Sequence, residues 1–440
     1  MEIAVRIAQL LVSLSLLIVC HELGHFIAAK LFKTRVEKFY LFFDPWFSLF
    51  KFKKGETEYG IGWLPLGGYV KIAGMVDESL DTQNLKSDPE PWEFRAKPAW
   101  QRLIVMLAGV FVNFVLAMFI YAMVAFCWGS QYLPTENIKY GIAVDSLGEK
   151  VGLRNGDMIK LVNGEKCEDY NKVLMTLLLN DPKTLTVNRQ GKDTTIEFSD
   201  DKIALILGAE TAFMSPRFPF QVEDFAENSP AQLAGFQKDD KVVAFNGEEC
   251  LFFDEVKKQL KANAGKKAVF TVQRGAETVP VTMTIPEDGL IKVMTKGPAE
   301  FFDFQTVEYG FFESFPIGIK RGFEKTGEYL KQFKLIFNPD TQAYKSVGSF
   351  ISMTKIFPGV WDWYAFWNLT ALFSIMLGVL NVFPIPGLDG GHALFTLVEM
   401  ITGKQPSLKF QETAQKIGMI ILLAIMVFAI GNDFIRHVFN

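Results

Sequence analysis

Two histidines and a glutamate lie together inside the first long apolar stretch of the chain. The run from Leu10 to Leu31 contains His21-Glu22-Leu-Gly-His25. On a helix, side chains four positions apart point to the same face, so His21 and His25 can bind one ion. This pattern on a helix is typical of a zinc site with two imidazole ligands and a glutamate base. Because ionisable side chains are costly in hydrocarbon, we expect a metalloprotease site within the membrane.

A second polar cluster lies near the other end of the chain, in Asn381-Val-Phe-Pro-Ile-Pro-Gly-Leu-Asp-Gly-Gly-His392. Prolines and glycines interrupt a helix, so we expect the chain to break here, line a polar pocket and begin a new helix near Gly390. Asp389 could cap that helix, but an unpaired carboxylate in the membrane is costly. A zinc ion with two histidine ligands lacks a third protein ligand, and Asp389 supplies it.

Two imidazoles and one carboxylate leave one position of a tetrahedral zinc site open, as in catalytic sites. Zinc lowers the pKa of water there toward about 7 and polarises the scissile carbonyl. Glu22 can then take the proton and pass it to the departing amide nitrogen. We interpret His392, three residues after Asp389, as a supporting or packing residue rather than a fourth ligand. The sequence therefore predicts one catalytic zinc ion per chain.

A helical substrate must be unwound before cleavage, because hydrogen bonds shield its carbonyl groups. Asn381 could hold an extended substrate or tie membrane helices together, and we favour the substrate role. Residues 57–75 are rich in glycine and β-formers and too short to span. We expect a re-entrant hairpin there rather than one on the surface, with Gly67 and Gly68 positioned to receive the substrate. Asn113 has the same two interpretations as Asn381, and there we prefer helix packing.

Four apolar stretches must position these residues, at roughly 4–32, 103–127, 365–385 and 415–435. The composition, 49% hydrophobic and 21% charged, fits a membrane protein, and the chain has no basic tract for nucleic acid. We expect the first stretch to be retained, because it is too long for a signal peptide. Lysines and arginines gather in the loops after the first and third stretches. The positive-inside rule places those loops in the cytoplasm, and both termini and the central segment in a bacterial periplasm.

The middle of the chain contains an internal repeat. Val151–Cys167 aligns without gaps on Ala234–Cys250, with an Asn-Gly turn in each copy. A predicted helix follows in each copy, at 170–179 and 253–261, and then a pair of strands. The copies resemble tandem bacterial PDZ domains, which bind a peptide C-terminus as an added strand. Steric bulk around the membrane core is the alternative role. The cysteine that ends each aligned segment is interpreted as a small buried residue, not as half of a disulfide.

The predicted fold is a multi-pass α-helical membrane protein with four transmembrane helices, a re-entrant β-hairpin and two periplasmic α+β PDZ domains. The expected segments, in chain order, are the first span (1–35), a cytoplasmic loop with the hairpin (36–101), the second span (102–127), PDZ-like domains (128–214 and 215–290), amphipathic helices at the membrane surface (291–363), the third span (364–389), a cytoplasmic loop (390–414) and the fourth span (415–436).

Together and in this order, the HELGH motif, the Gly-Gly-Tyr-Val-Lys segment, the two repeats and the Asn-x-x-Pro-x-Pro-x-Leu-Asp-Gly-Gly-His motif resemble the site-2 protease family. The likeness is strongest to bacterial members that regulate sigma factors. It implies zinc ligands at His21, His25 and Asp389, catalysis by Glu22 and substrate contact by Asn381. It also implies cleavage of single-span anti-sigma factors after a first cut outside, clearance of remnant signal peptides, and a PDZ pair that excludes intact substrates by size.

Two other classes of function stay open at this point. The first is an inactive membrane-anchored PDZ scaffold or chaperone, against which the intact Glu22 argues. The second is a metal or ion transporter, which four spans without inverted halves do not favour. For the protease, the expected partners are single-span membrane proteins, the lipid bilayer and peptide ligands of the PDZ domains.

Overall fold

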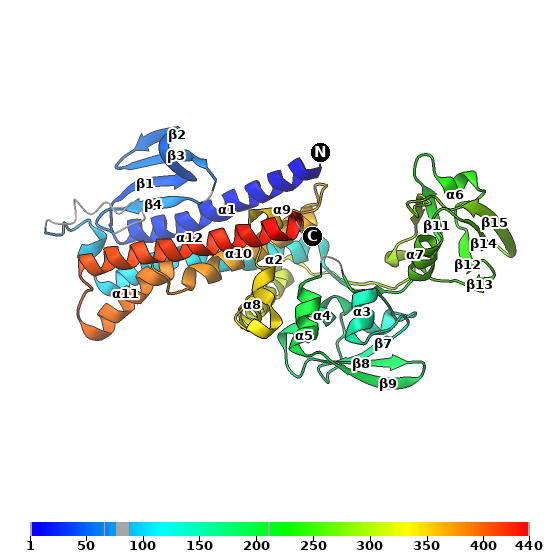
Figure 1. The fold of residues 1–440 in the computed structure, drawn as a ribbon. Coiled ribbons are helices and arrows are strands. Elements are labelled where there is room, and N and C mark those ends of the chain that lie inside the picture. The colour runs from blue at the N-terminus through cyan, green and yellow to red at the C-terminus, as the bar shows by residue number, and fades with distance from the viewer. Residues whose placement is uncertain (1, 66, 76–87, 210–211, 439–440) are drawn as a thin grey trace. The chain divides into compact units, whose positions relative to one another are not determined.

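The computed structural model in Figure 1 divides the chain into two compact units. The first comprises Met1–Gly129, Glu308–Lys334 and Tyr344–Asn440, and it contains the long apolar helices. The second comprises Ser130–Val307 and Leu335–Ala343, and it contains the internal repeat. The structure describes residues 2–65, 67–75, 88–209 and 212–438.

Among the described residues, four helices are long and apolar enough to cross a membrane. They are α1 (Glu2–Leu31), α2 (Ala99–Trp128), α10 (Trp363–Val382) and α12 (Leu408–Val438). They coincide with the four predicted stretches, with ends displaced by a few residues. The protein is therefore a multi-pass membrane protein.

Helices α1 and α2 approach each other closely because glycines face one another at the contact. A Cβ atom on Gly24 would lie 2.6 Å from the backbone oxygen of Ala108 and 2.9 Å from the Cα atom of Gly109. Small residues allow this kind of backbone contact between membrane helices. The glycine of the HELGH motif thus sets the distance between the two helices.

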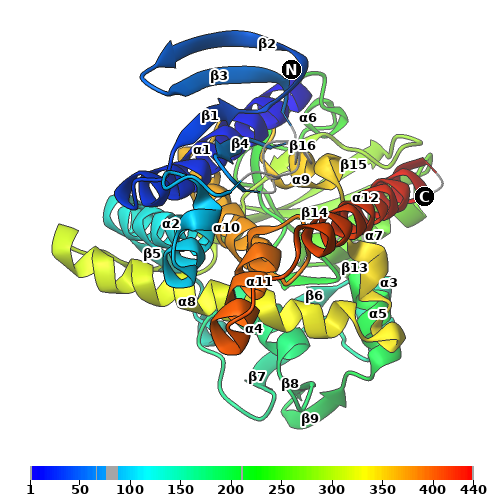
Figure 2. The same cartoon turned by 90° about the vertical axis from the view of Figure 1, so that its left-hand side faces the viewer.

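Residues 57–75 do not form the predicted two-stranded hairpin. The chain folds here into a four-stranded sheet of order β2-β3-β1-β4, which Figure 2 shows beside α1. Its strands are β1 (Val36–Leu41), β2 (Phe43–Lys54), β3 (Thr57–Leu64) and β4 (Tyr69–Ile72). Strand β1 pairs in parallel with β3 and antiparallel with β4, so it separates the two strands that we expected to pair.

The buried ring of Tyr40 explains why β1 fits between them. Tyr40 on β1 is opposite Gly60 on β3, and a Cβ atom on Gly60 would lie 2.3 Å from that ring. The tyrosine side chain therefore occupies the space that the glycine leaves. Strand β4 becomes an edge of the sheet.

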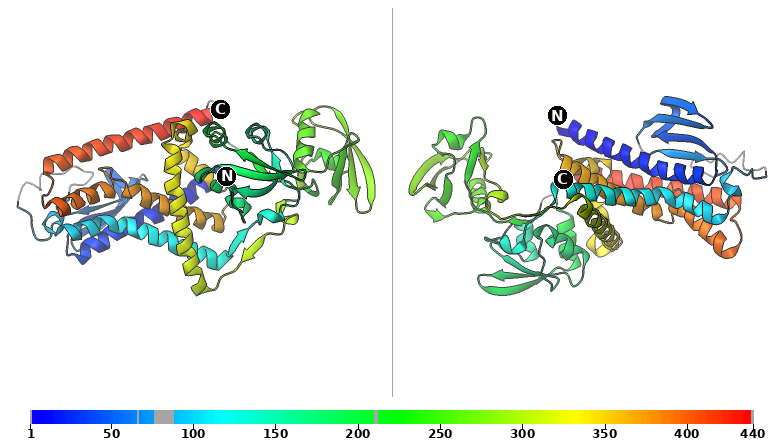
Figure 3. Two further views of the ribbon diagram at one scale, coloured as in Figure 1. Left: turned by 90° about the horizontal axis from the view of Figure 1, so that it is seen from below. Right: turned by 180° about the vertical axis from the view of Figure 1, so that it is seen from behind.

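Two helices of the 291–363 segment pack on the long helices. Helix α8 (Phe311–Ile336) crosses α2 steeply, as Figure 3 shows, and a Cβ atom on Gly318 would lie 2.5 Å from the backbone oxygen of Met118. Helix α9 (Phe350–Ile356) is tied to α12, because the buried carboxylate of Asp433 accepts a 2.7 Å hydrogen bond from the Ser349 backbone amide. Helices are present in this segment but begin later than expected, and their predicted place at the membrane surface stays a prediction.

The two sequence repeats have matching structures. Strands β7-β8-β9 form a sheet in the first copy, and β12-β14-β15 form the equivalent part of a sheet in the second. The helices predicted at 170–179 and 253–261 are α4 (Tyr170–Leu179) and α7 (Phe253–Ala262). Each copy also has a separate strand pair, β6 with β10 and β11 with β16.

The remaining elements of this unit are, in chain order, β5 (Ser130–Tyr132), β6 (Ile142–Val144), α3 (Ser146–Val151), β7 (Met158–Val162), β8 (Thr184–Arg189), β9 (Lys192–Glu197), α5 (Asp200–Leu207), β10 (Met214–Pro216), β11 (Val222–Phe225), α6 (Pro230–Leu233), β12 (Lys241–Phe245), β13 (Glu248–Glu249), β14 (Lys267–Arg274), β15 (Glu277–Thr284), β16 (Val293–Thr295) and β17 (Gln305–Val307). The expected repeat ends at 214 and 290 were too early, because β10 and β16 complete the strand pairs of the two copies.

A buried ion pair recurs in both copies. Asp157 pairs with Arg189, and Asp240 pairs with Arg274, each at 2.7 Å. A hydrogen bond from the guanidinium to the carboxylate raises the pKa of Arg274. The same carboxylate accepts the backbone N–H of Gln237, so Asp240 also closes the turn before β12.

The four cysteines are free, as expected for Cys167 and Cys250. Cys250 is buried at 2% exposure, and burial raises the pKa of its thiol to about 12. Cys167, by contrast, is partly exposed. Since the thiolate is the reactive form, native Cys250 is protected from alkylation.

We predict that Asp240→Ala accelerates maleimide labelling of Cys250 about 30-fold. Removing Asp240 leaves the Arg274 guanidinium without its carboxylate partner. The Arg274 side chain is 29% exposed, so water compensates part of the loss, and we take the free energy of local unfolding to fall by about 2 kcal/mol. Labelling requires local opening, so its rate follows local stability, and mass spectrometry of the Cys250 peptide measures it.

Asp239→Asn is the matched control, because asparagine tolerates the positive φ of 68° at this position and the change removes only the charge. Asp239 is exposed and pairs with Lys296 at the surface, where a salt bridge contributes little. Equal labelling rates in the two variants would contradict the role given to Asp240.

Candidate metal centre

Three ligand-type side chains meet among the apolar helices of the first unit. The Nε2 atoms of His21 and His25 are 3.2 Å apart. The Oδ2 atom of Asp389 lies 3.1 Å from His21 Nε2 and 3.3 Å from His25 Nε2. Both histidines are buried, at 6% and 5% exposure. The structure therefore brings these three residues together, as the sequence predicts.

The triangle has the dimensions of one face of a tetrahedral metal site. Bonds of about 2.0–2.1 Å to a tetrahedral ion place neighbouring ligand atoms about 3.3 Å apart. Nitrogen and oxygen lone pairs and a carboxylate charge at this separation repel one another unless a cation or protons lie between them. The donor set of two imidazoles and one carboxylate is also one that zinc accepts.

Helix α2 orients both imidazole rings from the opposite side. The Nδ1 atom of His25 lies 2.8 Å from the backbone oxygen of Val105. The Nδ1 atom of His21 lies 3.0 Å from the side-chain amide of Asn113. Each ring thus has its Nε2 atom directed at the cluster of His21, His25 and Asp389, called the ligand cluster below.

Gly109 on α2 leaves the space that the two rings occupy. A Cβ atom there would lie 2.3 Å from His25 Nε2 and 2.8 Å from His21 Cε1. Any side chain at this position would displace the ligand atoms themselves.

A break between helices α10 and α11 places Asp389 at the cluster. Helix α10 ends at Val382, and α11 (Asp389–Thr402) begins with Asp389 as its first residue and Leu388 as its N-cap. The break and restart predicted from the prolines and glycines are confirmed, but the capping alternative for Asp389 is wrong. A Cβ atom on Gly390 would lie 2.2 Å from the Val382 backbone oxygen, and one on Gly391 would lie 2.5 Å from that of Ile385. The two glycines therefore allow α11 to start tight against the preceding turn.

The other predicted site residues lie around the cluster. Asn381 approaches it, with its Nδ2 atom 3.5 Å from His21 Nε2. The carboxylate of Glu22 is not one of the three clustered ligand groups. The Cγ atom of Glu22 lies beside Gly68, at 3.4 Å from the position of a Cβ atom there. Gly67 instead lies against the ring of Phe43.

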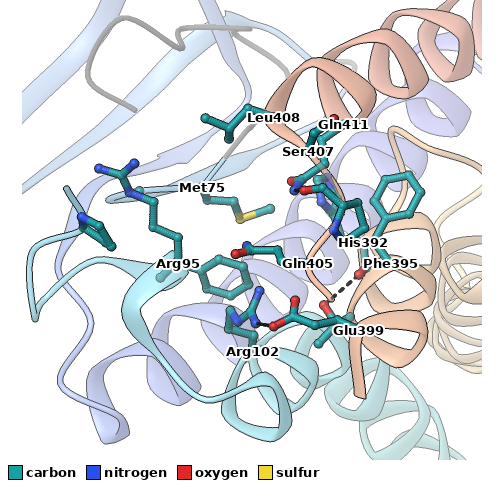
Figure 4. A pocket seen from close by; sticks show the side chains of 15 residues that line it. Met75, Arg95, Arg102, His392, Phe395, Glu399, Gln405, Ser407, Leu408 and Gln411 are labelled. Carbon is teal, nitrogen blue, oxygen red and sulfur yellow. Dashed lines mark hydrogen bonds and ion pairs between the residues drawn. The ribbon is translucent and has the colours of Figure 1, made fainter. Parts of the chain in front are cut away.

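His392 lies outside the ligand cluster in the part of the chain that the structure describes. It lines a separate cavity of about 370 Å³ together with Phe395 and Glu399 of α11. Figure 4 shows these side chains facing Met75 and Arg95 across the cavity. Beside them the buried guanidinium of Arg102 pairs with Glu399. The interpretation of His392 as a residue other than a ligand agrees with this geometry.

Three contributions to the site were not predicted from the sequence. Gly24 and Gly109 had no predicted role, although both permit the close contact of α1 with α2. Helix packing was the preferred interpretation of Asn113, whereas its amide contacts the ring of His21 in the cluster. The sequence did hold one indication of this role. Asn113 is a polar residue four positions after Gly109 inside an apolar span, and polar groups at membrane depth are usually functional.

Comparison with known proteins decides the family. The model of peptidase family M50 matches residues 9–425. The chain belongs to peptidase family M50. It is similar to the regulator of sigma E protease of Haemophilus influenzae, at 27% identity with 98% of each chain covered, and to the regulator of sigma-E protease RseP of Escherichia coli K12, at 28% identity with 98% of each chain covered. A putative zinc metalloprotease of Vibrio cholerae is also 28% identical, over 97% of each chain.

M50 peptidases depend on zinc, so the chain is a zinc metalloendopeptidase. The arrangement of His21, His25 and Asp389 fits this metal in donor type and spacing.

We predict that Gly109→Ala lowers zinc occupancy and reduces proteolysis about 100-fold, because the added methyl group displaces both imidazoles. Elemental analysis of the purified protein gives zinc per chain. Gly431→Ala on α12 is the control, since a Cβ atom there meets no atom within 4 Å. Wild-type zinc content in Gly109→Ala would contradict this account of the site.

Proposed function

We propose that this M50 peptidase is an intramembrane endopeptidase that cleaves the membrane-spanning segments of single-span proteins. The observation that carries the proposal is the position of the ligand cluster. His21 and His25 lie on α1 and Asp389 lies beside the end of α10, and both helices are candidate membrane spans. A hydrolytic centre at that place acts on a peptide that also lies in the membrane.

In this proposal His21, His25 and Asp389 hold the zinc ion. When bound, zinc polarises a carbonyl group and makes water more acidic. Glu22, adjacent in sequence to His21 but outside the ligand cluster, accepts the proton of the attacking water and returns it to the leaving amide nitrogen.

An extended substrate fits along the edge of the sheet that adjoins α1. Strand β4 lies at the edge of the order β2-β3-β1-β4, so its outer N–H and C=O groups can pair with an added strand. Gly68, just before β4, lies against Ile18 and Glu22 of α1. A peptide that pairs with β4 would pass the proposed general base, and Asn381 would hold its backbone from the other side of the cluster.

The names of the relatives suggest the substrate class. Regulators of sigma-E are similar to this chain over nearly its full length, and we propose anti-sigma factors after a first cut outside, and remnant signal peptides, as substrates. The protein then lies in the inner membrane, with the repeats and both termini in the periplasm. The repeats act there as PDZ domains that exclude intact substrates by size. The matched strand and helix order of the two copies supports a shared role.

We predict that Glu22→Gln retains zinc but lowers proteolysis at least about 100-fold, because glutamine has the same shape and cannot accept the proton. His25→Ala is the comparison and should lose zinc as well. Cleavage of a single-span substrate in liposomes measures the rate. Wild-type activity in Glu22→Gln would exclude the assigned base, and an inactive wild-type protein would favour the scaffold alternative.

The same liposome assay tests the place of cleavage. Mass spectrometry of the two products should locate the cut within the apolar segment of the substrate. A cut only in the water-exposed flanks would rule out intramembrane proteolysis while leaving the zinc site intact.

For Asn381→Ala we predict a rise in KM about tenfold with a smaller change in kcat, because the amide holds substrate and does not ligate zinc. Asn368→Ala on the same helix is the control, since that amide donates to the Tyr364 backbone oxygen within its own turn. Lost zinc with an unchanged KM would instead assign Asn381 to the metal site.

A further inference from the structure

The side chain of Asn113 is buried on the α2 side of the proposed metal site. The residue has 0% exposure on α2, and its amide nitrogen is placed 3.0 Å from His21 Nδ1. Its other amide atom, Oδ1, is buried without a hydrogen-bond partner among the described residues. The backbone oxygen of the same residue accepts a 2.7 Å hydrogen bond from the Ser374 hydroxyl of α10. Asn113 is thus fixed between α1 and α10.

His25 shows which kind of hydrogen-bond partner a metal-binding imidazole needs at its Nδ1 atom. His25 Nδ1 lies 2.8 Å from the Val105 backbone oxygen, which can only accept. His25 Nδ1 therefore carries a proton, and Nε2, which faces Asp389 and His21, is the nitrogen that can offer a lone pair to a metal. A hydrogen bond to the second ring nitrogen is the usual way in which proteins fix the tautomer of a metal-bound histidine.

His21 requires the same tautomer if its Nε2 atom is to bind zinc. The partner of His21 Nδ1 must then be an acceptor, and Asn113 offers one, its unpartnered Oδ1 atom, if the two ends of its amide exchange places. The two ends of a primary amide have nearly the same shape, and hydrogen-bonding chemistry decides which end faces a partner. With the nitrogen end facing His21, the ring proton would instead lie on Nε2, directed at Asp389 Oδ2 3.1 Å away.

We propose that Asn113 is a positioning residue for zinc, whose Oδ1 atom accepts the Nδ1 proton of His21 and so keeps the Nε2 lone pair available. This inference rests on the proposed ligand role of His21. The Asn113 side-chain oxygen would accept the Nδ1 proton of His21, as the Val105 backbone oxygen accepts that of His25. Because Asn113 is fully buried, bulk water does not reach this hydrogen bond to replace the acceptor.

Two substitutions of similar size separate the proposal from a packing role. Asn113→Asp presents only acceptor oxygens, and it should bind zinc at least as tightly as the wild type. Asn113→Leu fills the same space without an acceptor, and its zinc affinity should fall about 10- to 100-fold. Titration of the detergent-solubilised full chain against a zinc-chelating dye measures the affinity without any proteolysis assay. Ser374→Ala is the control, because it removes a hydrogen bond at the same residue without altering the group that faces His21.

The Asp variant decides the question even if the Leu variant does not fold. Weak zinc binding by Asn113→Asp would show that the amide nitrogen is the required group, and it would overturn the proposal. Wild-type affinity in a folded Asn113→Leu would overturn it as well. If the wild-type protein itself binds no zinc through His21, the proposed ligand set fails instead, so the two failures are distinguishable.

Nitrogen-15 labelling of histidine provides a readout that packing alone would not change. The chain has four histidines, so few resonances need assignment. In the zinc-loaded wild-type protein, His21 Nδ1 should be protonated and Nε2 should be the metal-bound nitrogen. A zinc-bound Nδ1 at His21 would contradict the proposal.

Discussion

Three atoms with lone pairs or negative charge lie 3.1 to 3.3 Å apart in a setting with little water to screen them. They are the Nε2 atoms of His21 and His25 and the Oδ2 atom of Asp389. Unless a cation or protons lie between them these atoms repel one another, and their spacing is that of three corners of a tetrahedral zinc site. The geometry of the surrounding helices follows from the need to hold this triangle.

Glycines at the helix contacts make that possible. Gly24 and Gly109 bring α1 and α2 close enough for the imidazoles to lie in the gap, and Gly390 and Gly391 start α11 directly against the turn that precedes it. The absence of side chains at neighbouring positions therefore helps to bring His21, His25 and Asp389 together. In membrane helices, where burial of apolar surface gives little drive to associate, such close packing is a main source of cohesion.

Local patterns predicted much of this arrangement. Hydrophobic runs gave the four long helices, the prolines gave the break before Asp389, and the repeat gave α4 and α7 with at most one residue of error. Contacts between distant segments were not predictable in this way. Strand β1 inserts between β3 and β4 because the ring of Tyr40 fits over Gly60, and neither residue reveals that pairing in its own segment. Asn113 looked like a packing residue because its partner, His21, lies on another helix.

X-ray absorption at the zinc edge shows most directly whether His21, His25 and Asp389 together bind one zinc ion. The full chain loaded with one equivalent of zinc should show a first shell of nitrogen and oxygen at about 2.0–2.2 Å, with the multiple scattering of two imidazoles. Asp389→Cys should replace one light ligand by a sulfur at about 2.3 Å and keep both imidazoles. A sulfur shell in the wild-type spectrum, or none in that of Asp389→Cys, would contradict the proposed ligand set.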